Sequence, residues 1–465
     1  MSKNEVEQLK RIFYPQSVAI IGASSNPDKI GGIILNNLIS DRYGGKIYPI
    51  NIRCGKDFDQ LFGIKCYSSI REVPDNVDVA VIAVPAKYVP QTLVECGEKG
   101  VKGAIIISSG FAEIGEEGKK LQEEIVQIAK KYGIRIIGPN CMGIVNTHAN
   151  LNLWFGLRIF KKGNIALVSQ SGAFADGFYA WAIDENLSFS IVVSIGNRSD
   201  VDEADLLRFL KEDPNTKVIG IYVEGLPIGK GRRFLEALKE TSAVIPVVIL
   251  KAGKSRSGAR ATLSHTGSLA GSAEIYKAAF KQYGGIVVDT SDEFIDVLKA
   301  LSHIERRKGK RIAILSNSGG LAILAADEAE KLELSVPEFP KEVKERILEV
   351  IPYFGNPSNP VDITAQGTPE EQKNMYCKVF EIINDPRLID AVLVIIEGSY
   401  PLNLMSAIKD AVCECIAIRR KLPVVVAWVG SKKLIGGMIE EIEEKGLPVY
   451  PSPERAVRVL KHILS

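Results

Sequence analysis

The chain has 465 residues, a length that suits about three domains of ordinary size. It is 46% hydrophobic and 25% charged, as globular proteins are, and no apolar run reaches the roughly 18 residues that a membrane-spanning helix needs. The formal net charge of +2 argues against a nucleic-acid-binding surface. The N-terminus is polar and lacks the apolar centre of a signal peptide, so we expect a cytoplasmic protein.

The seven cysteines do not show the paired spacing of a zinc site. Cys413 and Cys415 stand close together, but no second pair completes a ligand set. We therefore expect no metal site on this chain. We also expect the thiols to be reduced and mostly packed in the interior.

Short runs of β-branched residues that end in small residues recur along the chain. Continuous apolar runs of this kind are typical of strands buried on both faces, and amphipathic stretches such as residues 116–133 lie between them. This alternation predicts α/β domains with parallel sheets, in which ligands bind at the carboxyl ends of the strands. The clearest runs are residues 17–24, 78–86, 164–172, 218–225, 246–253, 311–320, 391–398 and 423–430.

Two interruptions of this alternation divide the chain. Residues 150–163 break the pattern, and the charged stretch SHIERRKGKR at 302–311 precedes a new strand. We therefore predict domains over residues 1–150, 151–305 and 306–465.

An internal similarity supports this division. IALVSQSGAFA at 165–175 and IAILSNSGGLA at 312–322 each combine a buried strand, a Ser-x-Ser-Gly turn and the start of a helix. The second and third domains are therefore expected to share one architecture.

The first candidate ligand loop begins at Gly22, after the first strand. A helix follows the loop, and the amides at a helix N-terminus favour a phosphate. The full G-x-G-x-x-G pattern is lacking, and the next strand leads to Asn51 and Arg53 rather than to an acidic residue that would bind a ribose hydroxyl. A basic residue there favours a ligand with an additional phosphate; a tight turn without a ligand is the alternative.

The two Ser-x-Ser-Gly turns, at Ser169–Gly172 and Ser316–Gly319, are candidate phosphate sites. Ser is a good N-cap, and Gly lets the backbone approach a ligand closely. Two such helix starts that face one point would bind phosphate strongly. Capping alone would explain either turn by itself.

His265 lies in a small, polar, Gly-containing segment, residues 255–272, which has no core pattern. We expect a loop from which a neutral imidazole reaches a phosphoryl group as a nucleophile. A solvated surface histidine is the alternative. The other three histidines, His148, His303 and His462, lie near predicted boundaries or in the last helix, and we expect them to be structural or solvated.

Glu224 ends the apolar run VIGIYVEGL. A carboxylate at the carboxyl end of a strand is well placed to accept a hydrogen bond from an imidazole, fix its tautomer and stabilise its cationic form. An exposed loop carboxylate is the alternative.

Three motifs together resemble one family. IGPNCMGIVN at 137–146, VSQSGAFADG at 168–177 and SHTGSLAG at 264–271 are similar to the NDP-forming acyl-CoA synthetases, namely the alpha subunit of ADP-forming acetyl-CoA synthetase and the related succinyl-CoA synthetases. The resemblance covers essentially the whole chain. It implies a Rossmann-like CoA-binding domain followed by two flavodoxin-like domains. It also implies the reversible conversion of acyl-CoA, phosphate and a nucleoside diphosphate into a carboxylic acid, CoA and a nucleoside triphosphate.

Carried over residue by residue, the resemblance implies that His265 is phosphorylated and that Glu224 supports it. Asn140 and Cys141 resemble a turn beside the reaction centre, where the substrate reacts. The implied phosphate contacts are Ser171, Gly172, Ala173, Ser318, Gly319 and Gly320. The implied CoA contacts are Gly22, Ala23, Ser24, Ser25, Asn51, Ile52, Arg53, Val84, Pro85, Ala86, Ser109, Gly110 and Phe111.

The family binds its nucleotide in an ATP-grasp module, and three α/β units account for this length. We therefore expect a separate ATP-grasp beta subunit to bind ADP or ATP with magnesium, in a heterotetramer with two copies of each subunit. Neither a membrane nor a nucleic acid is an expected partner. The acyl chain and the choice between ADP and GDP are not indicated.

Two other functions stay open at this point. One is an acyl-CoA-dependent transferase or hydrolase that forms no phosphohistidine. The other is a CoA-binding regulatory subunit that catalyses no reaction.

Overall fold

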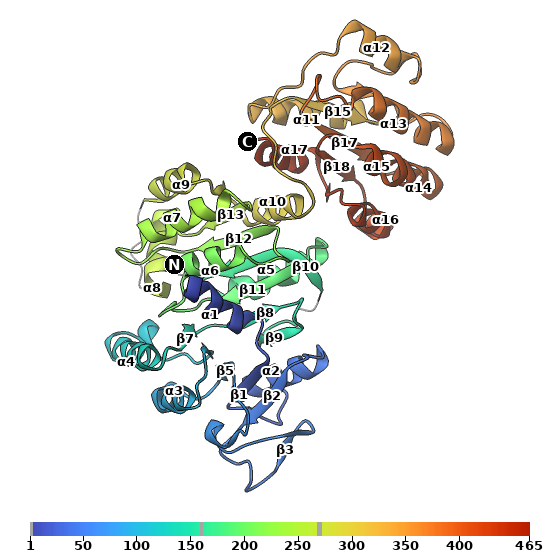
Figure 1. Cartoon of the computed structure of the whole chain (residues 1–465). Coiled ribbons are helices and arrows are strands. Elements are labelled where there is room, and N and C mark those ends of the chain that lie inside the picture. Colours follow the sequence, from blue (N-terminus) through green and yellow to red (C-terminus); the bar gives the residue numbers. More distant parts are fainter. Residues whose placement is uncertain (1–2, 159–160, 267–271) are drawn as a thin grey trace. The chain divides into compact units, whose positions relative to one another are not determined.

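The computed structural model describes residues 3–158, 161–266 and 272–465, and the side chains of 3–5 and 262–266 lie outside this description. The chain forms two compact units, Met1–Asp289 and Thr290–Ser465. Strands and helices alternate in both units (Figure 1). The predicted α/β fold class is confirmed, and all three main sheets are parallel at their centres.

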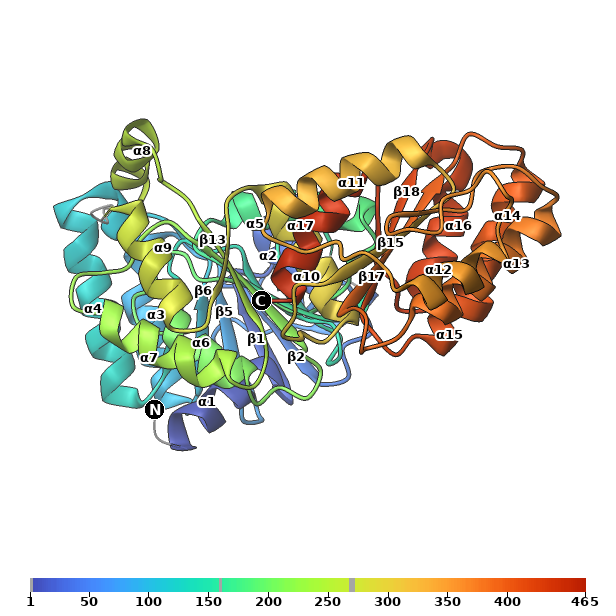
Figure 2. The ribbon, with the colours of Figure 1, turned by 90° about the horizontal axis from the view of Figure 1, so that it is seen from above.

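The first sheet has the parallel strand order β2-β1-β5-β6-β7, and Figure 2 shows β2, β1, β5 and β6 side by side. The chain first adds β2 on one side of β1 and then crosses to β5 on the other side. A crevice therefore opens between the carboxyl ends of β1 and β5. The strands are Ser17–Ile21 (β1), Lys46–Ile50 (β2), Val79–Ile82 (β5), Gly103–Ile106 (β6) and Arg135–Ile137 (β7). The helices are Lys3–Phe13 (α1), Ile30–Ser40 (α2), Val89–Glu98 (α3) and Glu116–Tyr132 (α4), with a hairpin of Gln60–Leu61 (β3) and Ile64–Lys65 (β4) after β2.

The second sheet has the order β14-β13-β12-β10-β11-β8-β9, and only the edge hairpin β8–β9 is antiparallel. This hairpin lies on both sides of residue 150, the predicted end of the first domain. The strands are Gly143–Asn146 (β8), Leu151–Trp154 (β9), Lys162–Ser169 (β10), Phe189–Ser194 (β11), Val218–Val223 (β12), Val247–Lys251 (β13) and Ile286–Val288 (β14). The helices are Gly172–Asp184 (α5), Glu203–Leu210 (α6), Gly231–Ser242 (α7), Arg256–Thr266 (α8) and Ala273–Gln282 (α9).

The N-terminal helix α1 joins the two sheets of the first unit. The ring of Phe13 stacks on that of Phe209 in α6, with 4.6 Å between the centroids. Asn146 Nδ2 in β8 donates to the Phe13 carbonyl at 3.0 Å. Arg135 in β7 also pairs with Asp200 before α6 at 2.8 Å. One hydrophobic core therefore runs through both sheets.

The sheet of the second unit has the same strand topology as the first sheet, with the parallel order β16-β15-β17-β18-β19. Helices α11 and α17 pack together on one side of this sheet, and α13 and α14 on the other (Figure 1). The strands are Ile312–Ser316 (β15), Val361–Asp362 (β16), Ala391–Glu397 (β17), Val424–Val429 (β18) and Val449–Tyr450 (β19). The helices are Ser291–His303 (α10), Gly319–Lys331 (α11), Lys341–Leu348 (α12), Pro369–Ile383 (α13), Leu402–Asp410 (α14), Ala417–Arg419 (α15), Lys432–Glu444 (α16) and Pro453–Ile463 (α17).

The expectation that the thiols are reduced is wrong for four of the seven cysteines. Disulfides join Cys54 to Cys66 and Cys377 to Cys415. The partners are 12 and 38 residues apart, and the fold rather than the spacing brings them together. Cys96, Cys141 and Cys413 are free and buried, as the prediction for the remaining thiols requires.

We predict that three thiols, not seven, react with a thiol reagent when the chain is unfolded without reductant. Reduction should lower the free energy of unfolding, by about 3 kcal/mol for the Cys54–Cys66 loop, because the bond restricts the unfolded chain. Thiol counting and denaturant titration with and without reductant measure both effects. A Cys96→Ala variant is the control, since its stability should respond to reductant as the native chain does.

Candidate functional site

A cavity of about 1090 Å³ lies in the first unit where the loops after six strands meet. These loops follow β5, β6 and β7 of the first sheet and β10, β11 and β12 of the second. The carboxyl ends of parallel strands are where such sheets bind ligands, so two sheets contribute to one site. The predicted residues in its lining are Val84, Pro85, Ser109, Asn140, Cys141, Ser171, Gly172 and Ala173. The predicted CoA contacts outside that lining are Gly22, Ala23, Ser24, Ser25, Asn51, Ile52, Arg53, Ala86, Gly110 and Phe111.

The loop after β1 lies at the crevice between β1 and β5. Gly22 has a φ of 94°, and a Cβ at this position would lie 2.4 Å from the Ala83 carbonyl oxygen, so the loop requires glycine here. The amides of Gly22 and Ala23 donate to the Ile50 carbonyl at 3.0 and 3.1 Å. Asn51 Nδ2 donates to the Ala23 carbonyl at 2.8 Å. The two predicted CoA loops, after β1 and after β2, are therefore neighbours.

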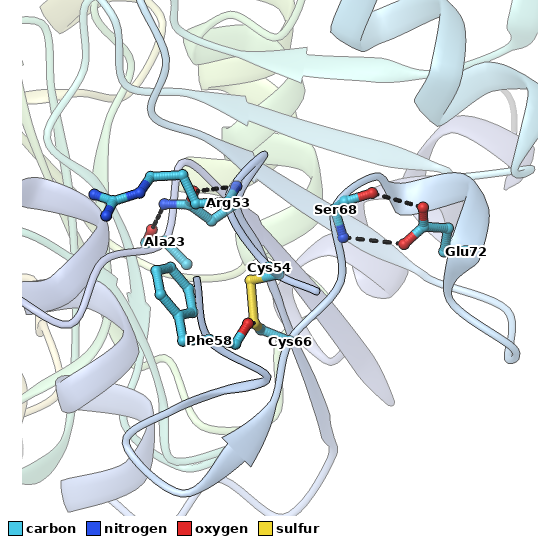
Figure 3. Close-up of a disulfide and its surroundings, with 8 residues drawn as sticks. Ala23, Arg53, Cys54, Phe58, Cys66, Ser68 and Glu72 are labelled. Carbon is cyan, nitrogen blue, oxygen red and sulfur yellow. Dashed lines mark hydrogen bonds between the residues drawn. A yellow bond between two sulfur atoms is a disulfide. The ribbon is translucent and has the colours of Figure 1, made fainter. Parts of the chain in front are cut away.

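Arg53 lies beside the Cys54–Cys66 disulfide on the loop after β2 (Figure 3). Its Nε bonds to Asp57 at 2.5 Å, and its guanidinium carbon lies 5.8 Å from the centre of the Phe58 ring. The side chain is nevertheless 66% exposed. A ligand in solution can therefore reach this side chain, whose charge Asp57 partly balances.

Glu113 is a cavity residue that the sequence analysis missed. Its carboxylate accepts from the amides of Gly110 and Phe111 at 2.6 and 3.1 Å and from Asn197 Nδ2 at 2.6 Å. Burial acts to raise the pKa of Glu113, but these hydrogen bonds outweigh it and lower the pKa. The Ser-Gly-Phe turn after β6 is therefore held by a carboxylate that also fixes the loop after β11.

The two Ser-x-Ser-Gly turns have the same internal geometry. Ser169 Oγ donates to the Ser171 carbonyl at 2.6 Å, and Ser316 Oγ donates to the Ser318 carbonyl at 2.9 Å. Helices α5 and α11 start immediately afterwards, at Gly172 and at the predicted Gly319–Gly320 pair. Ser171 also caps its helix by accepting from the Phe174 amide at 3.2 Å, whereas Ser318 makes no such cap.

The middle residue of each turn accepts a hydrogen bond from the backbone amide of a glutamate at the end of a neighbouring strand. Gln170 Oε1 accepts from the amide of Glu224, after β12, at 2.7 Å. Asn317 Oδ1 accepts from the amide of Glu397, at the end of β17, at 2.8 Å. Asn317 Nδ2 is buried and has no hydrogen-bond partner in the part of the chain that the structure describes. The sequence analysis missed Glu397, although both strands end in Glu-Gly.

Glu224 is 5% exposed, which excludes the alternative of an exposed loop carboxylate. Lys251, at the end of β13, donates from Nζ to the Glu224 carbonyl at 2.7 Å. Burial lowers the pKa of Lys251, and the Glu224 carboxylate partly opposes this shift. Burial and the same carboxylate raise the pKa of Tyr222 to about 12. Glu224 thus belongs to a buried polar cluster with Lys251 and Tyr222.

The backbone at His265 is helical, in α8. The expectation of a loop over residues 255–272 is therefore wrong for Arg256–Thr266, because the Ser-, Gly- and Ala-rich stretch winds into a helix. The side chain of His265 and residues 267–271 lie outside the described residues. His148 and His462 have structural partners, the Gly163 carbonyl and Glu293, each at 2.8 Å.

Within the described ranges, no group of three or more His, Cys, Asp or Glu residues could hold a metal ion. No helix there is both long and apolar enough to cross a membrane.

Three family models match consecutive parts of the chain. They are a CoA binding domain at residues 16–147, a succinyl-CoA ligase like flavodoxin domain at 162–301 and a Ligase-CoA domain at 312–462. Their order defines the class as CoA ligases related to succinyl-CoA ligase.

Individual relatives specify the class further. The alpha subunit of acetate–CoA ligase (ADP-forming) I from Pyrococcus furiosus is 44% identical, over 97% of this chain and 96% of that protein. An acetate–CoA ligase (ADP-forming) from Methanocaldococcus jannaschii is 41% identical, and the match covers 98% of this chain but 63% of that longer protein. An acetyl-coenzyme A synthetase from Candidatus Korarchaeum cryptofilum, solved with phosphate and ADP, has a TM-score of 0.90 at 37% identity, over 98% of this chain and 96% of that one. The chain belongs to the family of ADP-forming acetate–CoA ligase alpha subunits.

We predict that Cys141 resists alkylation in the folded protein at neutral pH, although it lines the cavity. Burial raises the pKa of its thiol to about 12, and the thiol donates to the Ile106 carbonyl at 3.3 Å. Because the thiolate is the reactive form, labelling should increase only as the pH approaches that value. Peptide mass spectrometry after iodoacetamide treatment measures this, and the same peptide from the unfolded chain is the control. Complete labelling of folded protein at pH 7 would contradict the assignment of Cys141 as a packed thiol.

Proposed function

We propose that this chain is the CoA-binding, phosphohistidine-carrying subunit of an acyl-CoA synthetase that converts acyl-CoA, phosphate and ADP into a carboxylic acid, CoA and ATP. One observation carries the proposal: loops of both kinds that the sequence predicts, for CoA and for phosphate, line the same 1090 Å³ cavity. A regulatory CoA-binding subunit would need the first kind alone. The domains at 1–150, 151–305 and 306–465 are part of this proposal.

The first chemical step takes place at the start of α5. Phosphate is bound by the amides of Ser171, Gly172 and Ala173, and one of its oxygens attacks the acyl carbonyl carbon. The carbon–sulfur bond breaks, CoA leaves as the thiolate and an acyl phosphate forms. Helix amides that are already oriented stabilise the negative charge without reorganisation, and the cavity holds both reactants in place.

His265 acts in the second step. Its neutral imidazole nitrogen attacks the phosphorus atom, the bond from phosphorus to the acyl oxygen breaks, and the carboxylate leaves. Glu224 stabilises the cationic ring, since a buried carboxylate that faces an imidazole favours its charged form. Asn140 and Cys141 border the reacting acyl group.

The second turn, at Ser318, Gly319 and Gly320, is the second phosphate-binding site. Its geometry duplicates that of the first turn, and the buried Nδ2 of Asn317 is a donor that still lacks an acceptor in the described residues. A phosphate oxygen would supply that acceptor. This is the physical support for including the turn in the route of the phosphoryl group.

CoA binds through the loops after β1, β2, β5 and β6. The helix start after Gly22 and the charge of Arg53 would bind the phosphates of its nucleotide end. Val84, Pro85 and Ser109, which line the cavity, would place its thioester end there. The remaining contacts are Ala23, Ser24, Ser25, Asn51, Ile52, Ala86, Gly110 and Phe111.

A separate ATP-grasp beta subunit completes the enzyme and binds ADP or ATP with magnesium, in a heterotetramer with two copies of each subunit. The relatives support this division, because those named alpha subunits are nearly covered by this chain, whereas others are longer single chains. We propose a cytoplasmic location. Two disulfides are compatible with it in hyperthermophiles, whose intracellular proteins are often rich in disulfides.

His265→Ala is expected to abolish both phosphorylation of the chain and ATP synthesis by the complex. The native complex, incubated with ATP labelled in the γ-phosphate, should carry phosphate that is lost in acid and kept in base. His148→Gln, at a histidine that bonds to the Gly163 carbonyl, is the control and should retain the label. Label that persists in His265→Ala would disprove the assignment.

Arg53→Ala is expected to weaken CoA binding about tenfold and to leave dephospho-CoA binding almost unchanged. The reason is that a charge-assisted bond to one additional phosphate is worth roughly 1.5–3 kcal/mol. Calorimetry on the isolated chain measures both affinities. Arg71→Ala, at an exposed arginine that pairs with Glu98, is the matched control. Equal losses for the two ligands would show that Arg53 does not bind the additional phosphate, which is the 3′-phosphate of CoA. An absence of CoA binding by the native chain would contradict the CoA site itself.

A further inference from the structure

The charged stretch at 302–311 forms one wall of a cavity. Arg306 and Arg307 from this stretch, together with Arg420 and Lys421 from the turn before β18, line a space of about 360 Å³ in the second unit. We call it the basic cavity. The proposed function uses none of these residues.

The basic cavity lies at the amino ends of the strands. Pro423 and Val424, at the start of β18, are in its lining, and the Pro423 carbonyl accepts from the amide of Val392 at the start of β17 at 2.9 Å. The Ser316–Gly319 turn and Glu397 lie at the carboxyl ends of β15 and β17. The basic cavity is therefore at the opposite edge of the sheet from the proposed phosphate-binding site at the Ser316–Gly319 turn.

Backbone bonds hold both walls in place. The amides of Arg307 and Gly309 donate to the carbonyls of Ile463 and Leu464 at 2.9 and 3.1 Å. On the other wall, the buried Asn384 side chain donates to the Arg419 carbonyl at 2.9 Å and accepts from the Lys421 amide at 3.2 Å. The main chain that carries the charged residues is thus held in place before any ligand binds, which reduces the entropy that binding costs.

None of the four Arg and Lys side chains of the basic cavity bonds to an Asp or Glu side chain within the described residues. Arg306 donates to an oxygen of Ser465, the last residue of the chain, at 2.7 Å, and this carboxylate balances its charge; Arg420 donates to the carbonyl of Gly446 at 3.0 Å. Glu305 is the one acidic residue in the lining. Arg420 is half-buried, and burial lowers its pKa, so part of its hydration is lost without a counter-charge.

Arginines nearby that do not line the basic cavity do have acidic partners. Arg311 pairs with Asp390 at 2.9 Å, and Arg387 with Asp385 at 2.5 Å. Arg419, next to Arg420 in the chain, pairs with Glu381. Arg307, Arg420 and Lys421, which line the cavity, thus differ from these three arginines in having no bonded carboxylate within the described residues.

We propose that the basic cavity binds a small anion through a diphosphate or triphosphate group. The guanidinium fork matches phosphate oxygens in bidentate geometry, and the three cations without a bonded carboxylate, Arg307, Arg420 and Lys421, favour a ligand with more than one negative charge. The volume lies within the range of small-molecule sites, about 300–1,000 Å³. The group can belong to inorganic pyrophosphate or to a nucleotide. The proposal does not depend on the proposed function.

Hydrogen exchange on the full chain tests the location. Millimolar pyrophosphate or ATP should protect peptides that cover residues 303–309 and 419–424. Protection by ATP alone would identify a nucleotide as the source, whereas equal protection by both would identify the diphosphate group as sufficient. No protection of these peptides by either probe would overturn the proposal. Protection by polyglutamate but by neither probe would also overturn it, in favour of an acidic protein partner.

Two double variants of equal charge test the residues. Arg306→Gln with Arg420→Gln should weaken the binding measured at these peptides by about a hundredfold, roughly tenfold for each guanidinium. Arg387→Gln with Arg419→Gln removes two paired arginines and should change it less than about threefold. Equal losses in the two variants would show that only the general charge of the chain matters and would refute the site. Circular dichroism identifies a variant that fails to fold, and single substitutions then replace the pair.

Discussion

A parallel strand must be followed by a crossover, and this constraint determines the structure of the candidate site. Because every strand of such a sheet runs the same way, every loop that follows a strand leaves from the same edge. In the first unit, the loops after β5, β6, β7, β10, β11 and β12 therefore meet in one cavity. Most polar groups of the site come from short loops, while the strands beneath them are mainly apolar.

The same constraint explains why one polar arrangement occurs twice. In each copy, an amide side chain in the middle of a Ser-x-Ser-Gly turn accepts from the backbone of a glutamate on an adjacent strand, Gln170 from Glu224 and Asn317 from Glu397. β10 pairs with β12, and β15 with β17, so in both sheets the turn and the carboxylate are neighbours by register. Each turn is thereby fixed to the strand beside it, and the helix start keeps its direction whether or not a ligand is bound.

Local patterns predicted much of this arrangement. Apolar runs that end in Gly, Ser or Glu indicated where strands stop and polar loops begin, and eight of the predicted site residues line one cavity. Contacts across the fold could not be predicted in this way. The short β3–β4 hairpin brings Cys54 and Cys66 together, and the packing of two sheets brings Glu113 and Asn197 together. The helix at His265 was missed because Ser, Gly and Ala show no apolar periodicity, although they are compatible with helix.

The basic stretch at 302–311 shows a different limit of sequence patterns. In the sequence it marks a predicted break between domains; in the structure, α10 ends at His303 and β15 begins at Ile312. Which of its cations are paired depends on residues far along the chain, such as Asp390 for Arg311. A run of charges therefore indicates exposure, while the fold decides which of the charges remain without a counter-charge.

The position of α1 has a consequence for the order in which the molecule forms during translation. Leu9, Ile12 and Phe13 are completely buried, yet the ring that Phe13 stacks on belongs to Phe209. At 5–20 residues per second, roughly ten to forty seconds of synthesis separate these two rings. During that interval α1 can pack on the first sheet, where Ile12 lies against Gly103 in β6, but its contact with α6 is still missing. The segment that leaves the ribosome first thus completes its contacts only after α6 has been made.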